Sequence, residues 1–254
     1  MTPMVTKKNN IHPSAIVADE AEIHESVEVG PFTIVHRNVV IEKGTKIGGW
    51  CEIGVPTRLG DGSPLFIGCD GLVRSHSVLY ESSTLGPGLI TGHHVCIREL
   101  TKAGRGLQLG SNGDIQGHCI IGDYLRTHRG VHIGQGSWIG NFVWMFPDVL
   151  LTNDPTPPSD ELVGPKVHDY AVLCAKATLL PGVVIGKDVV VGAHTLVNIN
   201  VPPGMLVTGS PAKVRCKASV LRLQKDPSTR AYPWRTRFHR GYPDEVIAAW
   251  KSEA

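Results

Sequence analysis

The chain has few aromatic residues and no long hydrophobic run. Phe, Trp and Tyr together make up 6% of its 254 residues. No stretch approaches the roughly 18 consecutive apolar residues that indicate a transmembrane helix. The first residues, Met1–Lys8, lack the hydrophobic segment of a secretory signal. We therefore expect a cytoplasmic protein that does not insert into a membrane.

Paired cysteine spacings are absent as well. The six cysteines are scattered along the chain without a Cys-x-x-Cys pair, and such pairs are typical of structural zinc sites. Thiols in a cytoplasmic protein are usually kept reduced. We expect free cysteines and no metal cofactor.

The charge is small but unevenly distributed. The net charge is +2, and from Lys217 onward we count eight Lys and Arg residues against four Asp and Glu residues. Basic and aromatic residues alternate between Tyr232 and Tyr242. This pattern is compatible with an anionic partner, with a nucleotide phosphate, or with a tail that packs on the rest of the chain. We favour the packed tail, with a helix from Pro243 through Trp250 and no nucleic-acid partner.

What the chain does have is a six-residue repeat of aliphatic residues, often followed by glycine. The repeat keeps one frame from Ile11 to Leu59, shifts by two residues from Ile67 to Leu151, and returns to the first phase from Val167 to Val197. Within these frames, the positions without a large apolar side chain are Thr91, Ala103 and Thr127. The two phase changes predict insertions near residues 55–66 and 152–166.

A period of six residues fits neither an amphipathic helix nor an ordinary half-buried strand. It fits a coil of short strands joined by tight corners, in which each side directs one aliphatic residue into a narrow core. Three sides make an 18-residue coil, and neighbouring coils are expected about 4.8 Å apart, the spacing of paired strands. Coils of this kind are stabilised by stacking, so the fold class is an all-β solenoid.

This repeat resembles that of the hexapeptide-repeat acyltransferases over roughly residues 11–215. The segment Val201–Lys213 (VPPGMLVTGSPAK) is similar to the sequence that closes the helix in that family. The resemblance implies a left-handed parallel β-helix, followed here by a short α-helical tail. We therefore expect one acyltransferase domain over residues 1–215 and a basic, aromatic tail over 216–254.

The 18-residue coil also serves as a map, because residues 18 apart should lie one above another. It predicts a compact histidine-rich patch over residues 93–132. The stacked columns are His93 with Ser111 and Arg129, His94 with Asn112 and Gly130, and Cys96 with Asp114 and His132. His132 above Asp114 forms either a His–carboxylate pair or a structural hydrogen bond.

Acyl transfer needs a base that takes a proton from the acceptor, and histidine suits this role near neutral pH. The segment Thr91–Glu99 (TGHHVCIRE) is similar to the base-containing pattern of relatives that act on nucleotide-linked sugars. It makes His93 the first candidate for the general base and His94 its competitor. His118, in a Gly-His-Cys context, is the third candidate.

The resemblance also implies where the substrates bind. The acceptor is expected near residues Asn112, Asp114, Arg129, His132, Asn153 and Asp154. Arg129 stands where amino-sugar acetyltransferases often have asparagine, and it could bind a carboxylate or phosphate instead. Acetyl-CoA is expected between subunits of a homotrimer, against residues Ala175, Ala177, Gly192, Ala193 and Lys213.

The resemblance thus predicts an acetyl-CoA-dependent N-acetyltransferase of a nucleotide-linked amino sugar for surface-polysaccharide assembly. The N-terminal segments Ile11–Val17 and Val29–Phe32 also look like those of the lipid A UDP-GlcNAc acyltransferases, so a longer acyl donor stays open, as does O-acetylation of another acceptor. A zinc hydratase of the γ-carbonic anhydrase type needs two histidines with four residues between them, and His128 and His132 have three. A non-catalytic scaffold is the remaining alternative.

Overall fold

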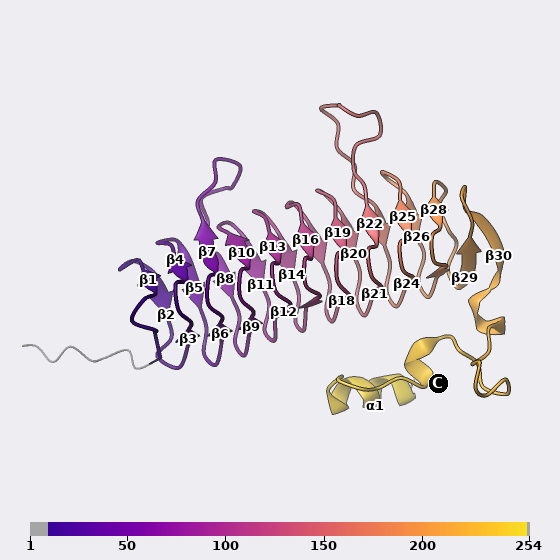
Figure 1. Cartoon of the computed structure of the whole chain (residues 1–254). Coiled ribbons are helices and arrows are strands. Elements are labelled where there is room, and N and C mark those ends of the chain that lie inside the picture. Colours follow the sequence, from indigo (N-terminus) through magenta and orange to yellow (C-terminus); the bar gives the residue numbers. More distant parts are fainter. Residues whose placement is uncertain (1–9, 253–254) are drawn as a thin grey trace, which may run out of the picture.

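The computed structural model of the protein describes residues 10–252. The N-terminal stretch Met1–Lys8, for which we expect no secretory segment, lies outside the described residues. In the described range the chain winds through three sheets, which we call A, B and C, and forms an elongated β-helix (Figure 1).

From β1 to β28 the described strands share one pattern, in which successive strands enter sheets B, C and A in turn. Sheet A contains β3 (Glu28–Val29), β6 (Lys46–Ile47), β9 (Leu72–Val73), β12 (Ile90–Thr91), β15 (Gln108–Leu109), β18 (Arg126–Thr127), β21 (Trp144–Met145), β24 (Val172–Leu173), β27 (Val190–Val191), β29 (Met205–Thr208) and β30 (Lys213–Lys217). Sheet B contains β1 (Ile16–Val17), β4 (Ile34–Val35), β7 (Glu52–Val55), β10 (Val78–Tyr80), β13 (Cys96–Ile97), β16 (Asp114–Ile115), β19 (His132–Ile133), β22 (Leu150–Leu151), β25 (Thr178–Leu179) and β28 (Leu196–Val197). Sheet C contains β2 (Glu22–Ile23), β5 (Val39–Ile41), β8 (Leu65–Ile67), β11 (Thr84–Leu85), β14 (Lys102–Ala103), β17 (Ile120–Ile121), β20 (Trp138–Ile139), β23 (Lys166–Val167) and β26 (Val184–Ile185).

The strand register confirms the 18-residue coil. Asp114 pairs with His132, and Ile97 pairs with Ile115, in parallel ladders. Only β30 runs antiparallel to its neighbour β29 among the paired strands of residues 10–252, and it ends the stack. The fold is the left-handed parallel β-helix that the resemblance implied, followed by the short C-terminal helix predicted from the tail sequence.

Two rows of side chains fill each side of the core. One row is the six-residue frame itself: Ile97 and Ile115 are fully buried. The second row lies two residues earlier, as at Val95, because alternate residues of a strand point to the same face. Leu59 is the exception in the first frame: it is 61% exposed, because the chain has left the coil at that point.

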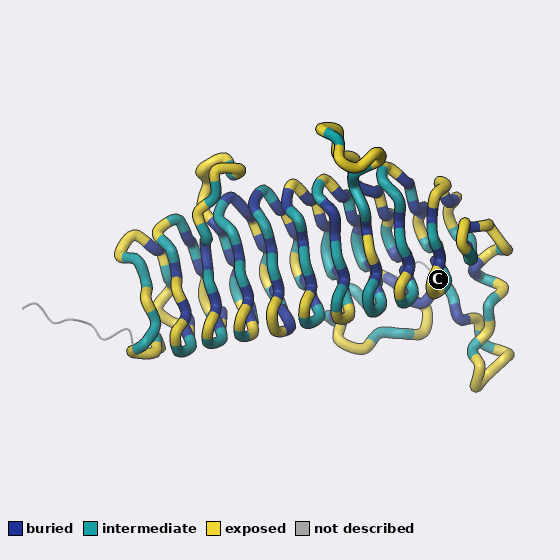
Figure 2. The backbone as a smooth tube through the Cα atoms, turned by 45° about the horizontal axis from the view of Figure 1, so that its top comes forward, coloured by how far each residue is buried: buried dark blue, intermediate teal, exposed yellow. Residues whose placement is uncertain are grey.

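Two long loops leave the helix at the edge between sheets B and C, which we call the BC edge. One connects β7 to β8 and the other connects β22 to β23. Figure 2 shows both as mostly exposed projections, whereas the coils carry regular rows of buried residues. These are the segments at which the six-residue repeat changes phase, and all strands around them keep their pairing.

The C-terminal tail, residues 218–252, turns back and packs on the helix (Figure 1). It contains the 3-10 turns η1 (Ala218–Val220) and η2 (Trp234–Thr236) and the helix α1 (Asp244–Ser252), in agreement with the helix expected from Pro243 to Trp250. Its buried aromatic residues contact sheet A and the CA edge, where sheet C passes into sheet A. The residues of this tail cluster are Tyr170, Val172, Val190, Ala218, Trp234, Tyr242 and Trp250. The packed tail favoured by the sequence is therefore the observed one.

None of the helices within residues 10–252 has the length and apolar character needed to cross a membrane.

Glycines at the edge between sheets A and B, the AB edge, permit the coils to stack closely. A Cβ on Gly110 would lie 2.3 Å from the backbone carbon of His128 and 2.5 Å from the backbone nitrogen of Arg129. Because backbone cannot move aside as a side chain can, we expect Gly110→Ala to lower the free energy of unfolding by about 3 kcal/mol, the upper part of the usual overpacking range. Chemical denaturation measures this loss.

Gly71→Ala is the matched control. Its added Cβ would meet the Thr45 side chain at 3.1 Å rather than backbone, so a smaller loss is expected. Equal losses for Gly71→Ala and Gly110→Ala would contradict the backbone-contact argument.

Candidate functional site

The predicted histidine patch is divided among different surfaces of the helix. His93, His94 and His128 lie at the AB edge, whereas His132 is the first residue of β19 in sheet B. His118 lies at the BC edge, between β16 and β17. The expectation of one compact patch is therefore wrong for His118. The reason is the three-sided coil: His118 is one side further along the chain than the column of His93.

Asp114 and His132 form a polar pair on the outer surface of sheet B. The two residues occupy neighbouring strands in direct register. His132 Nδ1 and Asp114 Oδ2 lie 2.9 Å apart, and the side chains are 37% and 30% exposed. Gln116 Nε2 donates a second hydrogen bond to the same carboxylate oxygen at 2.6 Å. The pair is thus held rigidly but stays open to solvent.

The charge state of Asp114 follows from these contacts. Partial burial opposes its ionisation, but the hydrogen bonds from His132 and Gln116 outweigh burial and hold the pKa of Asp114 below its ordinary value. Asp114 is therefore a carboxylate at neutral pH and can only accept hydrogen bonds. His132 must donate through Nδ1–H, which leaves Nε2 of the neutral ring as a free acceptor.

Cys96 lies directly before Asp114 in the same ladder. Burial, and then the Asp114 carboxylate, raise the pKa of the Cys96 thiol to about 11. The thiol is therefore protonated at neutral pH and is a poor nucleophile. Covalent catalysis through Cys96 is therefore disfavoured, and His132 is the candidate for proton transfer on this face.

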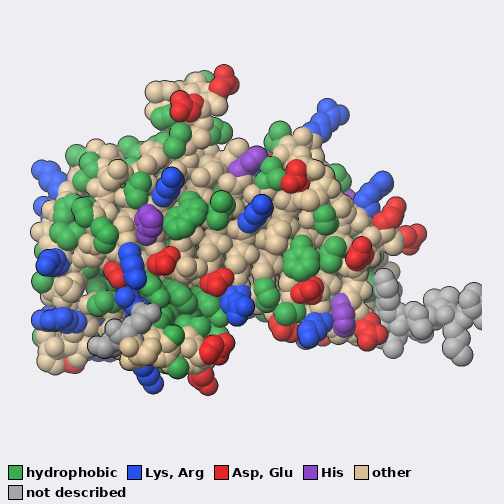
Figure 3. All heavy atoms as spheres, turned by 180° about the vertical axis from the view of Figure 1, so that it is seen from behind, with side chains coloured by type: hydrophobic (Ala, Val, Ile, Leu, Met, Phe, Trp, Pro, Cys, Tyr) green, Lys and Arg blue, Asp and Glu red, His purple; other side chains and the backbone are tan. Residues whose placement is uncertain are grey.

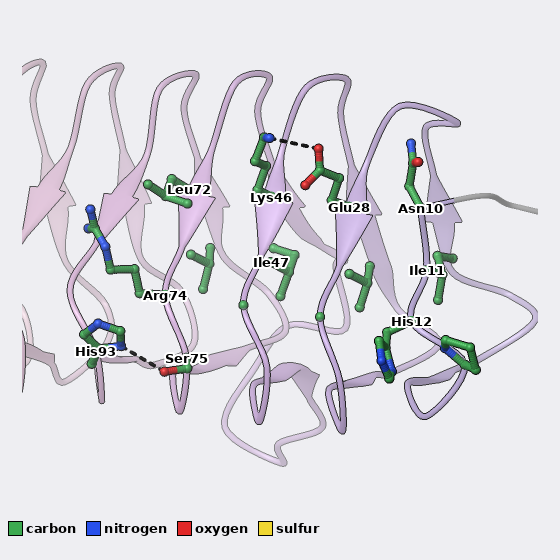
Figure 4. A pocket seen from close by; sticks show the side chains of 15 residues that line it. Asn10, Ile11, His12, Glu28, Lys46, Ile47, Leu72, Arg74, Ser75 and His93 are labelled. Carbon is green, nitrogen blue, oxygen red and sulfur yellow. Dashed lines mark hydrogen bonds and ion pairs between the residues drawn. The ribbon is translucent and has the colours of Figure 1, made fainter.

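His93 belongs to a different surface. It is exposed at the AB edge, and its Nδ1 lies 2.8 Å from Ser75 Oγ (Figure 4). Both residues border an open groove of about 770 Å³ on sheet A, together with Arg74. Because Ser75 can donate or accept, this contact does not fix which nitrogen of His93 carries the proton.

The neighbouring predicted residues also lie along the AB edge. His94 stacks on His76, with ring centroids 4.7 Å apart, and continues an aromatic row that begins at Phe32 and Trp50. Asn112 is exposed one coil further along. These residues line the edge without contacting the Asp114–His132 pair.

Arg129 also lies at the AB edge, one coil beyond Asn112. Its Nη1 lies 3.6 Å from Asp148 Oδ1, and the Arg129 side chain is 64% exposed. An ion pair this exposed contributes little to stability. Breaking the Arg129–Asp148 ion pair therefore costs little free energy, and Arg129 could bind an anionic ligand instead.

His118 has an exposed side chain, and its backbone N–H donates to the Glu99 carbonyl. Sheet B separates it from His93 and His94 at the AB edge. The structure thus places two of the three candidate bases, His93 and His94, together and leaves His118 apart.

The loop after β22 begins beside the coil of His132. A Cβ on Gly134 would lie 3.3 Å from the Asn153 Cβ, so the base of the loop covers Gly134. Asp154 orders the loop: its carboxylate accepts from the Ser159 hydroxyl at 2.7 Å and from the Thr156 and Ser159 amides. The hydrogen bond from the Ser159 hydroxyl is the main cause that lowers the pKa of Asp154. Asn153 is thus near the pair, while Asp154 is occupied within the loop.

The predicted donor residues divide in the same way. Within residues 10–252, the backbone N–H groups of Ala175 and Ala193 make no hydrogen bond, and both residues lie at the accessible AB edge. Gly192 N–H donates to Val207 O. Ala177 is fully buried in the core, and its N–H donates to Cys174 O. A ligand can therefore reach the amides of Ala175 and Ala193 but not that of Ala177.

Lys213 is exposed in β30. It lies at the end of the stack, beyond the coils of Ala175 and Ala193.

Two parts of this surface were not predicted. Gln116, the second partner of Asp114, stands two residues further along the chain, directly after β16, a spacing that places both side chains on one face. Ser75 lies 18 residues before His93, so the 18-residue spacing could have predicted this contact. All six cysteines are free, and no group of three or more metal-ligating side chains occurs in the described range.

In sequence the chain is similar to acyltransferases. It is 28% identical over 213 residues to the Bifunctional protein GlmU of Thermotoga petrophila, covering 80% of this chain but 44% of that protein. It is 24% identical over 242 residues to the acyl-[acyl-carrier-protein]–UDP-N-acetylglucosamine O-acyltransferase of Campylobacter concisus, covering 95% and 82%. The chain thus spans less than half the length of the first relative.

A structural counterpart is the UDP-N-acetylglucosamine acyltransferase from Campylobacter jejuni. It matches 96% of this chain and 82% of its own, at 14% identity and a TM-score of 0.39. No family model matches the chain.

Proposed function

Because the chain belongs to the hexapeptide-repeat acyltransferase family, we propose that it transfers an acetyl group from acetyl-CoA to the amino group of a nucleotide-linked sugar. The reaction needs a base for the acceptor amine and hydrogen-bond donors for the tetrahedral oxyanion. It also needs an extended site for the donor. The base and the donor site have candidate residues on sheet B and the AB edge.

The Asp114–His132 pair is the observation that carries this proposal. The ionised carboxylate accepts from Nδ1–H and so fixes the His132 tautomer, which leaves Nε2 unprotonated on a ring that is 37% exposed. When Nε2 takes the proton of the acceptor amine, the new imidazolium is stabilised by Asp114 at 2.9 Å. The geometry therefore favours His132 over His93 as the general base.

His93 is the second candidate for the base, in keeping with its sequence context. Its hydroxyl partner Ser75 lacks a charge, so it cannot stabilise an imidazolium as a carboxylate does. We propose that His93, with Asn112 and Arg129, contacts the acceptor along the AB edge. His94 and His118 are less suited, since one is stacked on His76 and the other lies at the BC edge.

The donor is proposed to lie along the AB edge. The free amides of Ala175 and Ala193 can hydrogen-bond the amide carbonyls of an extended thioester carrier. Lys213 at the end of the same stack supplies a positive charge for a phosphate. Exposed apolar side chains on the first coils, Phe32 at 52% and Trp50 at 57%, support the proposal of a homotrimer. We further propose that the protein acts in the cytoplasm, in surface-polysaccharide assembly.

The proposal is tested with purified protein and a panel of UDP- and dTDP-linked amino sugars. Calorimetry with acetyl-CoA should show binding, and mass spectrometry should show one acetyl group added to one member of the panel. No binding of acetyl-CoA at about 1 mM, equivalent to less than about 4 kcal/mol of binding free energy, would overturn the donor assignment.

A longer acyl chain carried by a protein is the second candidate donor. The observation that favours it is the match to the acyl-carrier-protein-dependent relative, which covers 95% of this chain. The same assay with acylated carrier protein and UDP-N-acetylglucosamine separates the two. Transfer from the carrier protein without transfer from acetyl-CoA would establish the second function.

A further inference from the structure

A pocket of about 280 Å³ lies between sheet A and the C-terminal tail, and none of the proposed catalytic residues lines it. The helix contributes His128, Trp144, Phe146 and Val172, and the tail contributes Tyr232, Trp234, Arg237, Phe238 and Arg240. Figure 3 shows hydrophobic and basic side chains next to one another at the end of the molecule where the tail packs. No carboxylate belongs to this lining.

The helix side of the pocket is lined by aromatic rings that contact one another. His128 stacks on Phe146, with ring centroids 4.8 Å apart and planes 17° from parallel. The tail side adds Phe238, which meets Trp144 edge-on at 5.7 Å. Walls of this kind favour a planar aromatic ligand, because stacked and edge-on aromatic contacts are both favourable.

The rim of the pocket carries positive charge without a matching carboxylate. Among residues 10–252, neither Arg237 nor Arg240 forms an ion pair. The Arg237 side chain donates through Nε to the Ala231 carbonyl, and the Arg240 guanidinium lies 5.6 Å from the centre of the Phe238 ring. Beneath them Arg126, 8% exposed, also lacks an acidic partner and donates to the Arg240 and Gly241 carbonyls. Unpaired guanidinium groups bind phosphate well.

From these contacts we propose that the pocket binds a nucleotide, with its base between the aromatic walls and its phosphates on Arg237 and Arg240. The proposal rests on the acyltransferase function above, in which donor and acceptor both contain a nucleotide. The pocket is close to the proposed acceptor and donor sites. His128, which lines the pocket, shares a coil with His132 and directly precedes Arg129. Ala175, a proposed donor contact, directly follows Cys174 at the same edge.

The test measures equilibrium binding of UDP and of adenosine 3′,5′-bisphosphate, a fragment of coenzyme A, without any turnover. Trp144 and Trp234 line the pocket, so nucleotide binding should quench tryptophan fluorescence. The double variant Arg237→Gln/Arg240→Gln should weaken the preferred nucleotide by about tenfold or more, because two charge-assisted hydrogen bonds are lost. Arg230→Gln, an exposed tail arginine outside the pocket, is the matched control and should leave binding unchanged.

Tighter binding of UDP assigns the pocket to the acceptor, and tighter binding of the bisphosphate assigns it to the donor. The proposal would be overturned if neither nucleotide bound, or if the double variant left nucleotide binding unchanged. It would also be overturned if octanoate, tested as an acyl-chain probe, bound while neither nucleotide did. Arginine-dependent nucleotide binding in a protein without acyl transfer would support the pocket and contradict the proposed function, so the two failures are distinguishable.

Discussion

Replacement of His132 by glutamine should lower kcat by about 10²–10⁴-fold, the usual contribution of a general base. Glutamine keeps a hydrogen bond to Asp114 but has no group that can accept and then release the acceptor proton. The dissociation constant of acetyl-CoA, measured by calorimetry, should be unchanged, because the proposed donor contacts lie on the AB edge at Ala175 and Ala193.

The comparison variant is His93→Gln. If His132 is the base, His93→Gln should raise KM for the acceptor more than it lowers kcat. The reverse split would transfer the role to His93, and unchanged kcat in both variants would show that the reaction proceeds by positioning alone. A shift in the acidic limb of the pH–rate profile of Asp114→Asn, which removes the partner charge, would separate catalysis from a structural role.

Replacement of Trp250 by alanine should release the C-terminal tail. Trp250 is 5% exposed, meets Tyr242 edge-on at 4.9 Å, and donates through Nε1 to the Tyr170 hydroxyl at 3.3 Å. The free energy that holds the tail on the β-helix should fall by about 3–5 kcal/mol, typical of truncating a buried tryptophan. Hydrogen exchange of the backbone amides of residues 218–252 measures this change directly.

The rest of the molecule should barely respond to this change. Each coil of a solenoid is stabilised mainly by its neighbours, so protection of coils such as that of Ile97 should persist. Lys251→Ala, at an exposed position beside Trp250, is the control. Global unfolding of Trp250→Ala would contradict independent docking of the tail, and unchanged tail protection would contradict the anchoring role of Trp250.

The repeat made most of the fold predictable, for a physical reason. Each side of a coil has the same task, to bury one residue of the frame, so Val35 and Ile139 obey one rule although more than 100 residues separate them. The rule also covered Thr91, a frame residue that is fully buried, and whose hydroxyl accepts from the Arg74 amide. It failed at Leu59, since a loop can carry an aliphatic residue in phase by chance.

The candidate site was less predictable. The 18-residue spacing shows which residues lie one above another on successive coils, but it does not show directly on which of the three sides of the coil a residue lies. Asp114 and His132, which are 18 residues apart, were correctly stacked. His118 was assigned to the same patch because it is close in sequence, although it lies around the corner. The pocket of His128 and Phe238 could not be found from sequence, because the tail has no repeat that fixes where it docks.

The coil also decouples the length of the protein from the geometry of its chemistry. His128 of the pocket and His132, the proposed base, lie on a single coil, four residues apart. Whole coils gained or lost toward the N-terminus would move neither residue relative to the other. The N-terminal part of the β-helix can therefore become longer or shorter during evolution in steps of 18 residues. Such a change alters the length of the molecule and the surface available for assembly, while the distance between the pocket and the proposed base stays constant.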